Sequence, residues 1–336
     1  MLNFISLFNE EEDIVLLALG LRGFFFSLFL KRKFQLCVPY IGQLMRISFI
    51  RKLYFYFLHH LYKPNVVWLY GGGEIASEIL RMRHIFGKET KFILRSAGED
   101  IQYSSDLKYG IPDNSARKKN LKKNYLKADY FWSLSSEITE LYKNFGIPPK
   151  KIQQIGNLVK IPIKISKTKN KKITIGIIGR NHPKKQFGLA VDVAKSLQDS
   201  NFNFIFKTPK FNVPTNILNI KKHTETKINN LSFWPPLDVW EFYAQCDAIL
   251  ITSAIESFGN VTIEAGLSGC GIIMSKNVTG YQIAKDLGFQ VIGFSEFSVE
   301  NITAAINKFE PEFVHQNPQS LNESFLIDFI KLVKSE

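Results

Sequence analysis

The stretch from residue 248 to residue 275 reads AILITSAIESFGNVTIEAGLSGCGIIMS and contains three consecutive elements. It opens with the apolar run AILITS, typical of a buried strand, and closes with a second such run, GIIMS. Between them an SFGN turn leads into NVTIEAGLSG, which has the length of a short packed helix. Two buried strands joined by a helix predict parallel strands with a right-handed crossover, so this stretch indicates the α/β class.

The same alternation continues along the rest of the chain. In the second half, strand-like and helix-like runs succeed one another at residues 172–180, 187–197, 202–208, 237–246, 279–288, 290–294 and 299–309. The first half is less regular, with candidate strands at 2–8, 66–70, 91–96 and 128–135 and candidate helices at 74–87 and 135–146. We predict two Rossmann-like domains at 1–160 and 161–318, joined near the lysine-rich segment 156–172. A C-terminal helix at 319–336 is expected to pack back onto the first domain.

Length and composition agree with two globular domains. The chain has 336 residues, of which 45% are apolar and 22% charged, so it can bury two cores. The net charge is +13, but residues 1–172 hold 29 basic and 14 acidic residues, whereas residues 173–336 hold 14 and 16. The first half therefore carries the whole basic excess. The three cysteines lack a pairing or metal-ligand spacing, and the N-terminus lacks the pattern of a signal peptide, so we expect a cytoplasmic protein.

The segment from residue 16 to residue 62 supports two interpretations. It combines LRGFFFSLFLKRKF with MRISFIRKLYFYFLHHLYK, in which aromatic and aliphatic residues alternate with arginines and lysines. Such stretches are typical of helices that lie in a membrane interface. They also fit core helices with solvated basic edges, and the two interpretations have equal weight. The apolar run at 14–30 is interrupted by Arg22 and two glycines, which disfavours a membrane span.

The turn inside the first stretch has the composition of a ligand site. A glycine turn at a helix start offers free backbone amides and the positive end of the helix dipole, which suit a phosphate or a sugar hydroxyl. Gly259 permits close approach of the backbone. Glu256 precedes the turn, and we expect Glu264 to lie about two turns into the helix, where it would bind a second part of the same ligand.

Three blocks together resemble the retaining GT-B glycosyltransferases, in particular glycosyltransferase family 4. The pattern E-S-F-G-x-x-x-x-E-A at 256–265 is similar to the E-x7-E region of that family. The block IGIIGRNHPKKQFGLAVDVAKSL at 175–197 is similar to its first C-domain strand and following turn, although Gln186 replaces the usual glycine. Residues 126–157 resemble the end of its N-domain. The resemblance implies a GT-B fold, with two Rossmann-like domains facing across a cleft.

The resemblance also implies roles for individual residues. The catalytic set would be Arg180, Lys185 and Glu256, with the two cations on the donor diphosphate and Glu256 on the donor sugar. The other donor-binding residues would be Gly179, Ser257, Phe258, Gly259, Asn260 and Glu264, the last on the nucleotide ribose. Fixed cations stabilise a leaving diphosphate more in the transition state than in the ground state, so the chemistry agrees. The family further implies retention of anomeric configuration. No Asp-x-Asp or His/Cys cluster has a ligand context, so we expect no metal and no cofactor.

The loop after the predicted strand 91–96 is the candidate acceptor side. Gly98, Glu99 and Asp100 lie there, facing the cleft. In the family this loop often reads His-Gly-x-Asp and its histidine contacts the donor sugar, but here that position is Ala97. Glu99 and Asp100 can still bind the acceptor or the sugar, but this loop has no histidine to contact the donor sugar. His182, between Arg180 and Lys185, is expected to face solvent.

Other functions fit parts of the sequence. One alternative is a dehydrogenase, because a G-x-G-x-x-A pattern formed by Gly71, Gly73 and Ala76 follows a strand. A dehydrogenase would give no role to the candidate residues of the second half, which are Arg180, Lys185, Glu256 and Glu264. A nucleotide-sugar epimerase or hydrolase of the same fold is a second alternative. Nucleic-acid binding is the third, and it is disfavoured because the aromatic residues of the basic half follow an apolar helical rhythm.

The favoured hypothesis is a retaining, metal-independent glycosyltransferase. It would move a sugar from a nucleotide-diphosphate donor to a glycan or lipid-linked glycan acceptor in cell-surface polysaccharide synthesis. Because the basic excess lies in the half expected to receive the acceptor, we predict peripheral docking on the anionic inner face of the cell membrane.

Overall fold

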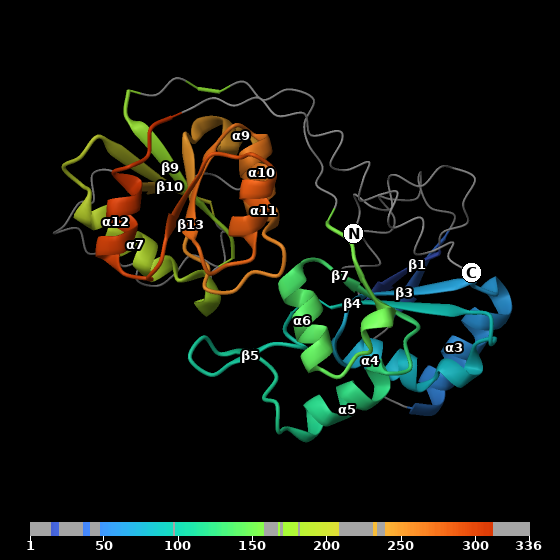
Figure 1. The fold of residues 1–336 in the computed structure, drawn as a ribbon. Coiled ribbons are helices and arrows are strands. Elements are labelled where there is room, and N and C mark those ends of the chain that lie inside the picture. Colours follow the sequence, from blue (N-terminus) through green and yellow to red (C-terminus); the bar gives the residue numbers. More distant parts are fainter. Residues whose placement is uncertain are drawn as a thin grey trace.

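The structure is a computed structural model that describes residues 15–19, 36–40, 48–96, 98–157, 167–168, 171–180, 182–207, 231–233 and 239–311. Within these ranges the chain forms two α/β domains, each built on a parallel sheet (Figure 1). In Figure 1 the N-terminal domain runs from blue to green and the C-terminal domain from yellow to red. The α/β class that the alternation of strands and helices predicts is therefore confirmed.

The C-terminal domain is built on a six-stranded sheet. Its strands are β9 (Ile173–Ile178), β10 (Phe202–Lys207), β11 (Leu231–Phe233), β12 (Ala248–Ile251), β13 (Gly271–Ser275) and β14 (Val291–Phe294). They are ordered β11-β10-β9-β12-β13-β14, and all neighbours pair in parallel. This is the 3-2-1-4-5-6 order of a doubly wound nucleotide-binding sheet, in which the direction of winding reverses between the first and fourth strands. Here that switch point lies between β9 and β12.

Helices cover both faces of this sheet (Figure 1). They are α7 (Phe187–Ser196), α9 (Val239–Gln245), α10 (Asn260–Leu267), α11 (Gly280–Asp286) and α12 (Val299–Ile306). Successive side chains of a strand point to opposite faces, so β12 contributes to two cores. Ala248 and Leu250 pack in the core with α7 and α12, whereas Ile249 and Ile251 pack in the core with α9 and α10. Burial on both faces explains why the strand reads as an uninterrupted apolar run.

The N-terminal domain has a four-stranded parallel sheet. Its strands are β3 (Val66–Gly71), β4 (Lys91–Ser96), β7 (Tyr130–Ser133) and β8 (Ile152–Gln154), in that order across the sheet. Its helices are α3 (Ser48–Tyr62), α4 (Gly73–Arg81), α5 (Ala116–Tyr125) and α6 (Ser136–Asn144). Phe92, Ile93 and Leu94 of the inner strand β4 are fully buried. Trp132 of β7 is also fully buried, and its indole Nε1 donates to the carbonyl of Ile155 at 2.6 Å.

A short hairpin extends this domain toward the other one (Figure 1). It pairs β5 (Tyr103–Ser104) with β6 (Tyr109–Gly110) in antiparallel orientation. Neither the hairpin nor α5, which follows it, belongs to the elements predicted from the sequence. Two-residue strands leave no periodic pattern, so the sequence alone does not indicate them.

The second of the two basic, aromatic runs forms a helix, α3, whereas the first run at 21–34 lies outside the described residues. Strands β1 (Val15–Leu19) and β2 (Leu36–Tyr40), which the sequence did not predict, flank that first run and pair in parallel. A five-residue apolar run fits a strand as well as a helical segment, and pairing with a second strand decides between them. The strand predicted at 2–8, the predicted domain boundary at 160 and the predicted C-terminal helix at 319–336 lie outside the described residues.

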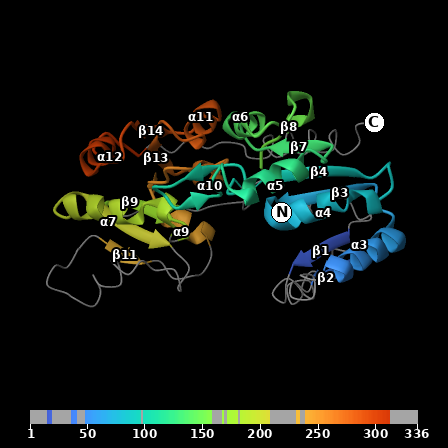
Figure 2. The same cartoon turned by 90° about the horizontal axis from the view of Figure 1, so that it is seen from below.

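Helix α3 has one buried side and one exposed apolar side. Phe55 is buried and packs against Phe86 at 6.4 Å between ring centroids. The exposed side consists of Phe49, Leu53, Tyr56, Phe57 and Leu61, each 51% to 73% exposed, and we call these five residues the α3 face. The helix lies at the edge of the molecule remote from the C-terminal domain (Figures 1 and 2). None of the described helices is long and apolar enough to cross a membrane.

Candidate functional site

Two loops meet at the carboxyl edge of the C-terminal sheet, at its switch point. One follows β9 and includes residues 179–186, and the other follows β12 and includes residues 252–259. The Ala254 amide donates to the Lys184 carbonyl at 2.8 Å, and the Thr252 hydroxyl donates to the Lys185 carbonyl at 2.6 Å. These bonds hold the loops together where doubly wound sheets bind their ligands.

An ion pair between Lys185 and Glu256 joins the same two loops. The Lys185 ammonium donates to Oε1 of Glu256, and the two side chains are only 15% and 13% exposed. Charges withdrawn from water in this way interact more strongly than an exposed pair. Two of the three predicted catalytic residues are therefore in direct contact. The third, Arg180, follows Gly179 after the end of β9 and is exposed.

The glycine expected before α7 is replaced by Gln186, but the backbone is of the kind that glycine favours. Gln186 has φ 47° and ψ 44°, which is the left-handed region, and it is the N-cap of α7. Such a conformation costs an L residue about 1–2 kcal/mol. A glutamine therefore adopts here a backbone conformation that glycine adopts at lower cost.

Glu264 lies closer to the turn than expected. Helix α10 begins at Asn260, so Glu264 is about one turn into the helix, and the prediction of two turns is wrong. The reason is that Ser257 to Gly259 form a turn with Gly259 in the left-handed conformation, and only the residues after them are helical. The Tyr243 hydroxyl donates to Oε2 of Glu264 at 2.9 Å. Burial raises the pKa of Glu264, and the bond from Tyr243 partly offsets that rise.

The turn from Ser257 to Asn260 also connects the two domains. The Ser135 hydroxyl donates to the Ser257 carbonyl at 3.1 Å, and the Asn157 side-chain amide donates to Oδ1 of Asn260 at 2.7 Å. Phe258 is buried in a hydrophobic cluster that contains the N-terminal core and also Ile263 of α10. Phe258 and Asn260, both predicted to line the donor site, thus contact or pack against the N-terminal domain.

The three predicted acceptor-side residues have different surroundings. Asp100 is buried, and its carboxylate accepts hydrogen bonds from the hydroxyls of Ser96 and Tyr125. Gly98 has φ +105°, and a methyl group there would lie 2.6 Å from the Tyr109 hydroxyl and 2.8 Å from Oγ of Ser257. Glu99 is exposed. Asp100 is therefore already satisfied within the protein, whereas Glu99 is available to a ligand.

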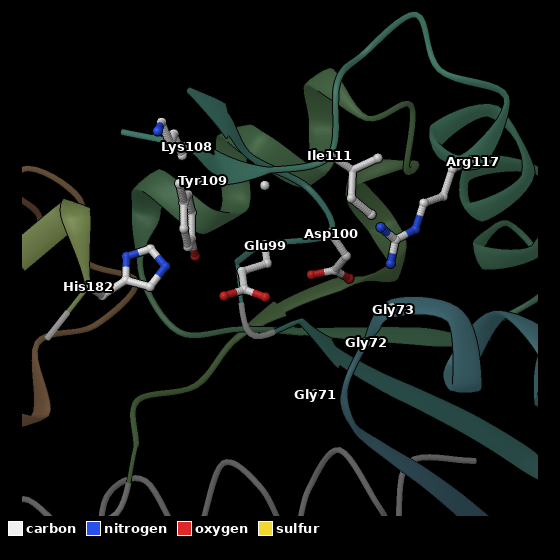
Figure 3. Close-up of a pocket in the computed structure, with 11 residues that line it drawn as sticks. Gly71, Gly72, Gly73, Glu99, Asp100, Lys108, Tyr109, Ile111, Arg117 and His182 are labelled. Atoms are coloured by element: carbon white, nitrogen blue, oxygen red, sulfur yellow. The ribbon is translucent and has the colours of Figure 1, made fainter. Parts of the chain in front are cut away.

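A cavity of about 410 Å³ opens beside Glu99 (Figure 3). It is lined by residues 71–73 after β3, by Glu99 and Asp100, by hairpin residues 108–111, by Arg117 and by His182. All of these except His182 belong to the N-terminal domain. Figure 3 shows the glycines and Arg117 at one end, His182 and Tyr109 at the other, and the two acidic residues between them. Among the described residues, no group of His, Cys, Asp and Glu side chains is arranged to hold a metal ion.

His182 lies at the contact between the two domains and not in open solvent, so that expectation is wrong. It is half-buried and packs edge-on against Tyr109 at 5.9 Å between ring centroids. The neighbouring Lys184 ammonium lies 4.5 Å from the centre of the same tyrosine ring. The loop that carries Lys185 is thus held against the hairpin by one aromatic and one cation–π contact.

The electrostatics of this contact follow from burial. Burial and the Lys184 charge lower the pKa of His182, and burial lowers the pKa of Lys184. Burial and the nearby Glu99 raise the pKa of the Tyr109 hydroxyl, which keeps its proton at neutral pH. Nδ1 of His182 accepts from the Lys184 amide at 3.3 Å, so the proton of the neutral ring is on Nε2.

The sequence did not mark Tyr109 and Arg117 as cavity residues, nor Lys184 as a contact of Tyr109. The glycine triplet at 71–73 is visible in the sequence as a turn after a strand, but in the sequence analysis it supported only the dehydrogenase alternative. No signal marks Tyr109, because its position depends on a hairpin that folds against the other domain.

The comparisons with known proteins agree with this geometry. Residues 160–316 match the protein family described as Glycosyl transferases group 1. The whole fold is similar to that of HepE from Anabaena, solved with UDP and glucose, with a TM-score of 0.74, 14% identity and coverage of 100% of this chain and 95% of that one. It is also similar to the lipopolysaccharide outer core galactosyltransferase WaaB, with a TM-score of 0.63, 16% identity and coverage of 91% and 85%.

Sucrose-phosphate synthase from Thermosynechococcus elongatus is another structural neighbour, with a TM-score of 0.66, 14% identity and coverage of 88% of this chain and 79% of that one. A search of curated proteins found no match. Residues 160–316 are thus similar to the Glycosyl transferases group 1 family, and the α/β fold of parallel sheets matches that of the GT-B glycosyltransferases.

Proposed function

We propose that the protein is a retaining, metal-independent glycosyltransferase that moves a sugar from a nucleotide-diphosphate donor to a glycan or lipid-linked glycan acceptor in polysaccharide synthesis. The observation that carries the proposal is the Lys185–Glu256 pair at the switch point of a group 1 domain. Structural neighbours support the donor class, because HepE was solved with UDP-glucose and with UDP.

In this proposal the donor diphosphate binds at Arg180 and Lys185. The guanidinium binds phosphate oxygens through paired donors, and the ammonium adds a point charge. Because the diphosphate competes with Glu256 for the Lys185 ammonium, donor binding frees the Glu256 carboxylate to accept a hydrogen bond from a sugar hydroxyl. The resting ion pair thus keeps both groups in position until the donor arrives.

Glu264 is proposed to bind the nucleotide ribose. Its carboxylate is oriented by Tyr243 and lies one helical turn beyond the Gly259 turn. A carboxylate accepts hydrogen bonds from two ribose hydroxyls at once. Held in this way, the nucleotide presents its diphosphate to the loop after β9.

Transfer breaks the bond between the anomeric carbon and the diphosphate oxygen and forms a bond to the acceptor oxygen on the same face of the sugar. The acceptor proton passes to the departing phosphate oxygen. Arg180 and Lys185 stabilise the negative charge that develops on the diphosphate, and they do so most in the transition state.

A donor screen tests this proposal. Nucleotide sugars are assayed for protection against thermal unfolding and for turnover, using the wild type and the variants Arg180→Ala and Glu264→Ala, with Arg81→Ala as a control for a remote exposed arginine. The screen should find a protecting donor whose effect is lost in the first two variants and kept in the third. If no nucleotide sugar protects the wild type, or if all variants bind it equally, the proposal fails. Free sugar or an epimerised nucleotide as the sole product would favour the hydrolase or epimerase alternative.

We further propose that the enzyme works at the cytoplasmic surface of an anionic membrane, with the α3 face as its docking surface. At 100° per residue the five residues of the α3 face span about 140° of the helix. Lys52 and His60 are exposed on the same helix, and the surrounding half of the chain carries the whole basic excess. An exposed apolar stripe with basic neighbours fits the interface of an anionic bilayer.

Vesicle pelleting tests the docking surface. The protein should pellet with phosphatidylglycerol vesicles and much less with phosphatidylcholine vesicles, because both apolar and charge contacts are needed. Phe57→Glu should abolish pelleting, whereas Leu126→Glu, at an exposed leucine outside the α3 face, should not. Equal pelleting of the two variants, or no pelleting of the wild type, would contradict this surface.

A further inference from the structure

The Tyr109 hydroxyl is a buried polar group at the edge of the cavity beside Glu99. Tyr109 is only 2% exposed, and its hydroxyl has no hydrogen-bond partner within the described part of the chain. Tyr109 lines the cavity, and in Figure 3 its hydroxyl points toward Glu99. A buried hydroxyl without a partner is unfavourable, so a ligand group that bonds to it is favoured.

The surroundings of the Tyr109 hydroxyl suit a neutral partner. Burial and the charges of Glu99, Asp100 and Glu256 raise the pKa of this hydroxyl, so it keeps its proton at neutral pH. A protonated phenol can donate to a ligand hydroxyl and accept from another. The same three carboxylates make a second anion near this hydroxyl unfavourable.

Carboxylates also dominate the middle of the cavity. Glu99 is exposed there, and no residue that the structure describes bonds to its carboxylate. Asp100 lies against the glycine loop, since a Cβ atom at Gly72 would be 2.1 Å from its Oδ2. At that end Arg117 pairs through its Nε with the Glu74 carboxylate at 2.8 Å. An anionic ligand would therefore meet like charges, whereas sugar hydroxyls can donate to them.

The Tyr109 end of the cavity adjoins the candidate donor site. The Lys184 ammonium lies 4.5 Å from the centre of the Tyr109 ring. A Cβ atom at Gly98 would lie 2.6 Å from the Tyr109 hydroxyl and 2.8 Å from Oγ of Ser257. Lys184 and Ser257 belong to the two loops that form the candidate donor site. A sugar hydroxyl bound at Tyr109 is therefore close to both loops.

We propose that this cavity binds an uncharged sugar ring of the acceptor, and that Tyr109 and Glu99 select it. The Tyr109 hydroxyl would bond to one sugar hydroxyl, and the Glu99 carboxylate would accept from another. All lining residues except His182 belong to the N-terminal domain, which favours the acceptor over the donor sugar. The inference rests on the proposed transferase function, since it names the acceptor class for that function.

Matched pairs of sugars test the charge selection. In excess uridine diphosphate, the protein is titrated by NMR with methyl glucoside and methyl galactoside. It is also titrated with methyl glucuronide and methyl galacturonide, in which a carboxylate replaces the hydroxymethyl group. At least one neutral sugar should bind about tenfold more tightly than its carboxylate counterpart, because the carboxylate is repelled by like charges. Equal or tighter binding of the carboxylates, or binding of no sugar, would overturn the proposal.

Tyr109→Phe separates a ligand contact from a structural role. It should weaken binding of the neutral sugar about threefold to tenfold, which is the loss expected for one hydrogen bond. Because the hydroxyl has no partner among the described residues, the variant should leave the melting temperature of the free protein unchanged or raise it. Tyr103→Phe, at an exposed tyrosine of the same hairpin, should change neither quantity. Unchanged sugar binding in Tyr109→Phe, or a lowered melting temperature, would contradict the assignment.

Variants of glutamates locate the charge selection and the sugar. Glu99→Gln should remove most of the preference for the neutral sugar, whereas Glu89→Gln, at an exposed glutamate before the opposite end of β4, should retain it. A preference that survives Glu99→Gln intact would contradict the role of Glu99. Glu256→Gln, on the donor side, should still bind the neutral sugar. Loss of binding in that variant would place the sugar in the donor site and overturn the inference.

The thermal screen keeps this inference separate from the proposed function, because donor protection is measured independently of sugar binding. Intact donor protection with no preference for neutral sugars would remove this inference alone. A wild type that no nucleotide sugar protects would instead remove the transferase proposal.

Discussion

The two domains share one architecture but present their polar groups differently. In the C-terminal domain, Lys185 and Glu256 come from loops directly after two adjacent strands and are already paired. In the N-terminal domain, the cavity wall comes from a glycine loop and a hairpin, and the Tyr109 hydroxyl there has no partner among the described residues. The C-terminal side is thus organised before any ligand binds, whereas the N-terminal side leaves groups open for one.

Charge separates the two halves of the chain as well. Residues 1–172 carry a net charge of +15 and residues 173–336 a net charge of −2. The half with the paired cation is therefore nearly neutral overall, and its chemistry depends on placed charges. The α3 face belongs to the basic half and lies at the edge of the molecule remote from the C-terminal domain (Figure 2).

The largest expected effect tests whether the two domains depend on each other. Phe258 belongs to a C-terminal loop and is buried in a hydrophobic cluster formed by residues of both domains, so Phe258→Ala should lower the free energy of unfolding by about 3–5 kcal/mol. Denaturant unfolding followed by tryptophan fluorescence measures the loss. The exposed Phe57→Ala serves as the control, with little change expected. A loss as small as that of the control would mean that the domains are stabilised independently.

The next effect tests the paired charges. Lys185→Ala should reduce kcat/KM by about 10²–10³-fold, because one fixed donor to the developing charge is lost. Steady-state kinetics with the donor found in the screen measures this. Lys195→Ala removes a lysine that pairs with Asp192 on the surface of α7, and it should leave kcat/KM unchanged. Similar losses in both variants would show that general charge, and not the paired position, matters.

A pH-dependent effect tests the environment of Glu264. Because burial raises the pKa of Glu264, its carboxyl group stays protonated in the folded protein at a pH where it is already ionised in the unfolded chain. The free energy of unfolding should therefore fall as pH rises from about 4.5 through the raised pKa. Glu264→Gln should remove this slope and weaken nucleotide binding about tenfold.

Tyr243→Phe sharpens the same test. The Tyr243 hydroxyl lowers the pKa of Glu264, so the loss of this hydroxyl should raise that pKa. The free energy of unfolding should then continue to fall up to a higher pH than in the wild type. Thermal unfolding across a pH series compares the three proteins. An unchanged slope in Glu264→Gln would assign the pH dependence to another group.

The smallest effect concerns backbone strain. Gln186→Gly should stabilise the protein by about 0.5–1 kcal/mol, because glycine adopts the left-handed conformation without steric cost. Lys63, with φ 43°, allows the same substitution far from the loop as a control. Thermal denaturation compares both variants. Destabilisation by Gln186→Gly alone would show that contacts of the glutamine side chain outweigh the strain.

Much of the C-terminal domain was predictable because its signals are local. Buried strands read as apolar runs, and the helices between them have apolar faces, so β9, β12 and β13 and the intervening helices occur where expected. The meeting of the Lys185 and Glu256 loops then follows from the strand order of the sheet.

The errors have a common physical cause. Glu264 lies one turn into its helix because a left-handed glycine delays the helix start, and His182 is partly covered because a hairpin from the other domain packs on it. Asp100 is satisfied internally by Tyr125, which lies on a helix that the sequence did not indicate. Each depends on backbone or tertiary detail that apolar periodicity does not carry.

The amino-acid sequence by itself determined the α/β class, the order of strands and helices in the second half, and the loops that hold the candidate donor residues. These features depend on residues close together in the chain. Only the tertiary structure decided that Lys185 pairs with Glu256, that Phe258 joins a hydrophobic cluster shared by the two domains, and that Tyr109, His182 and Arg117 border one cavity. Those contacts join distant segments, and the packing of two domains and one hairpin, rather than any local pattern, determines their geometry.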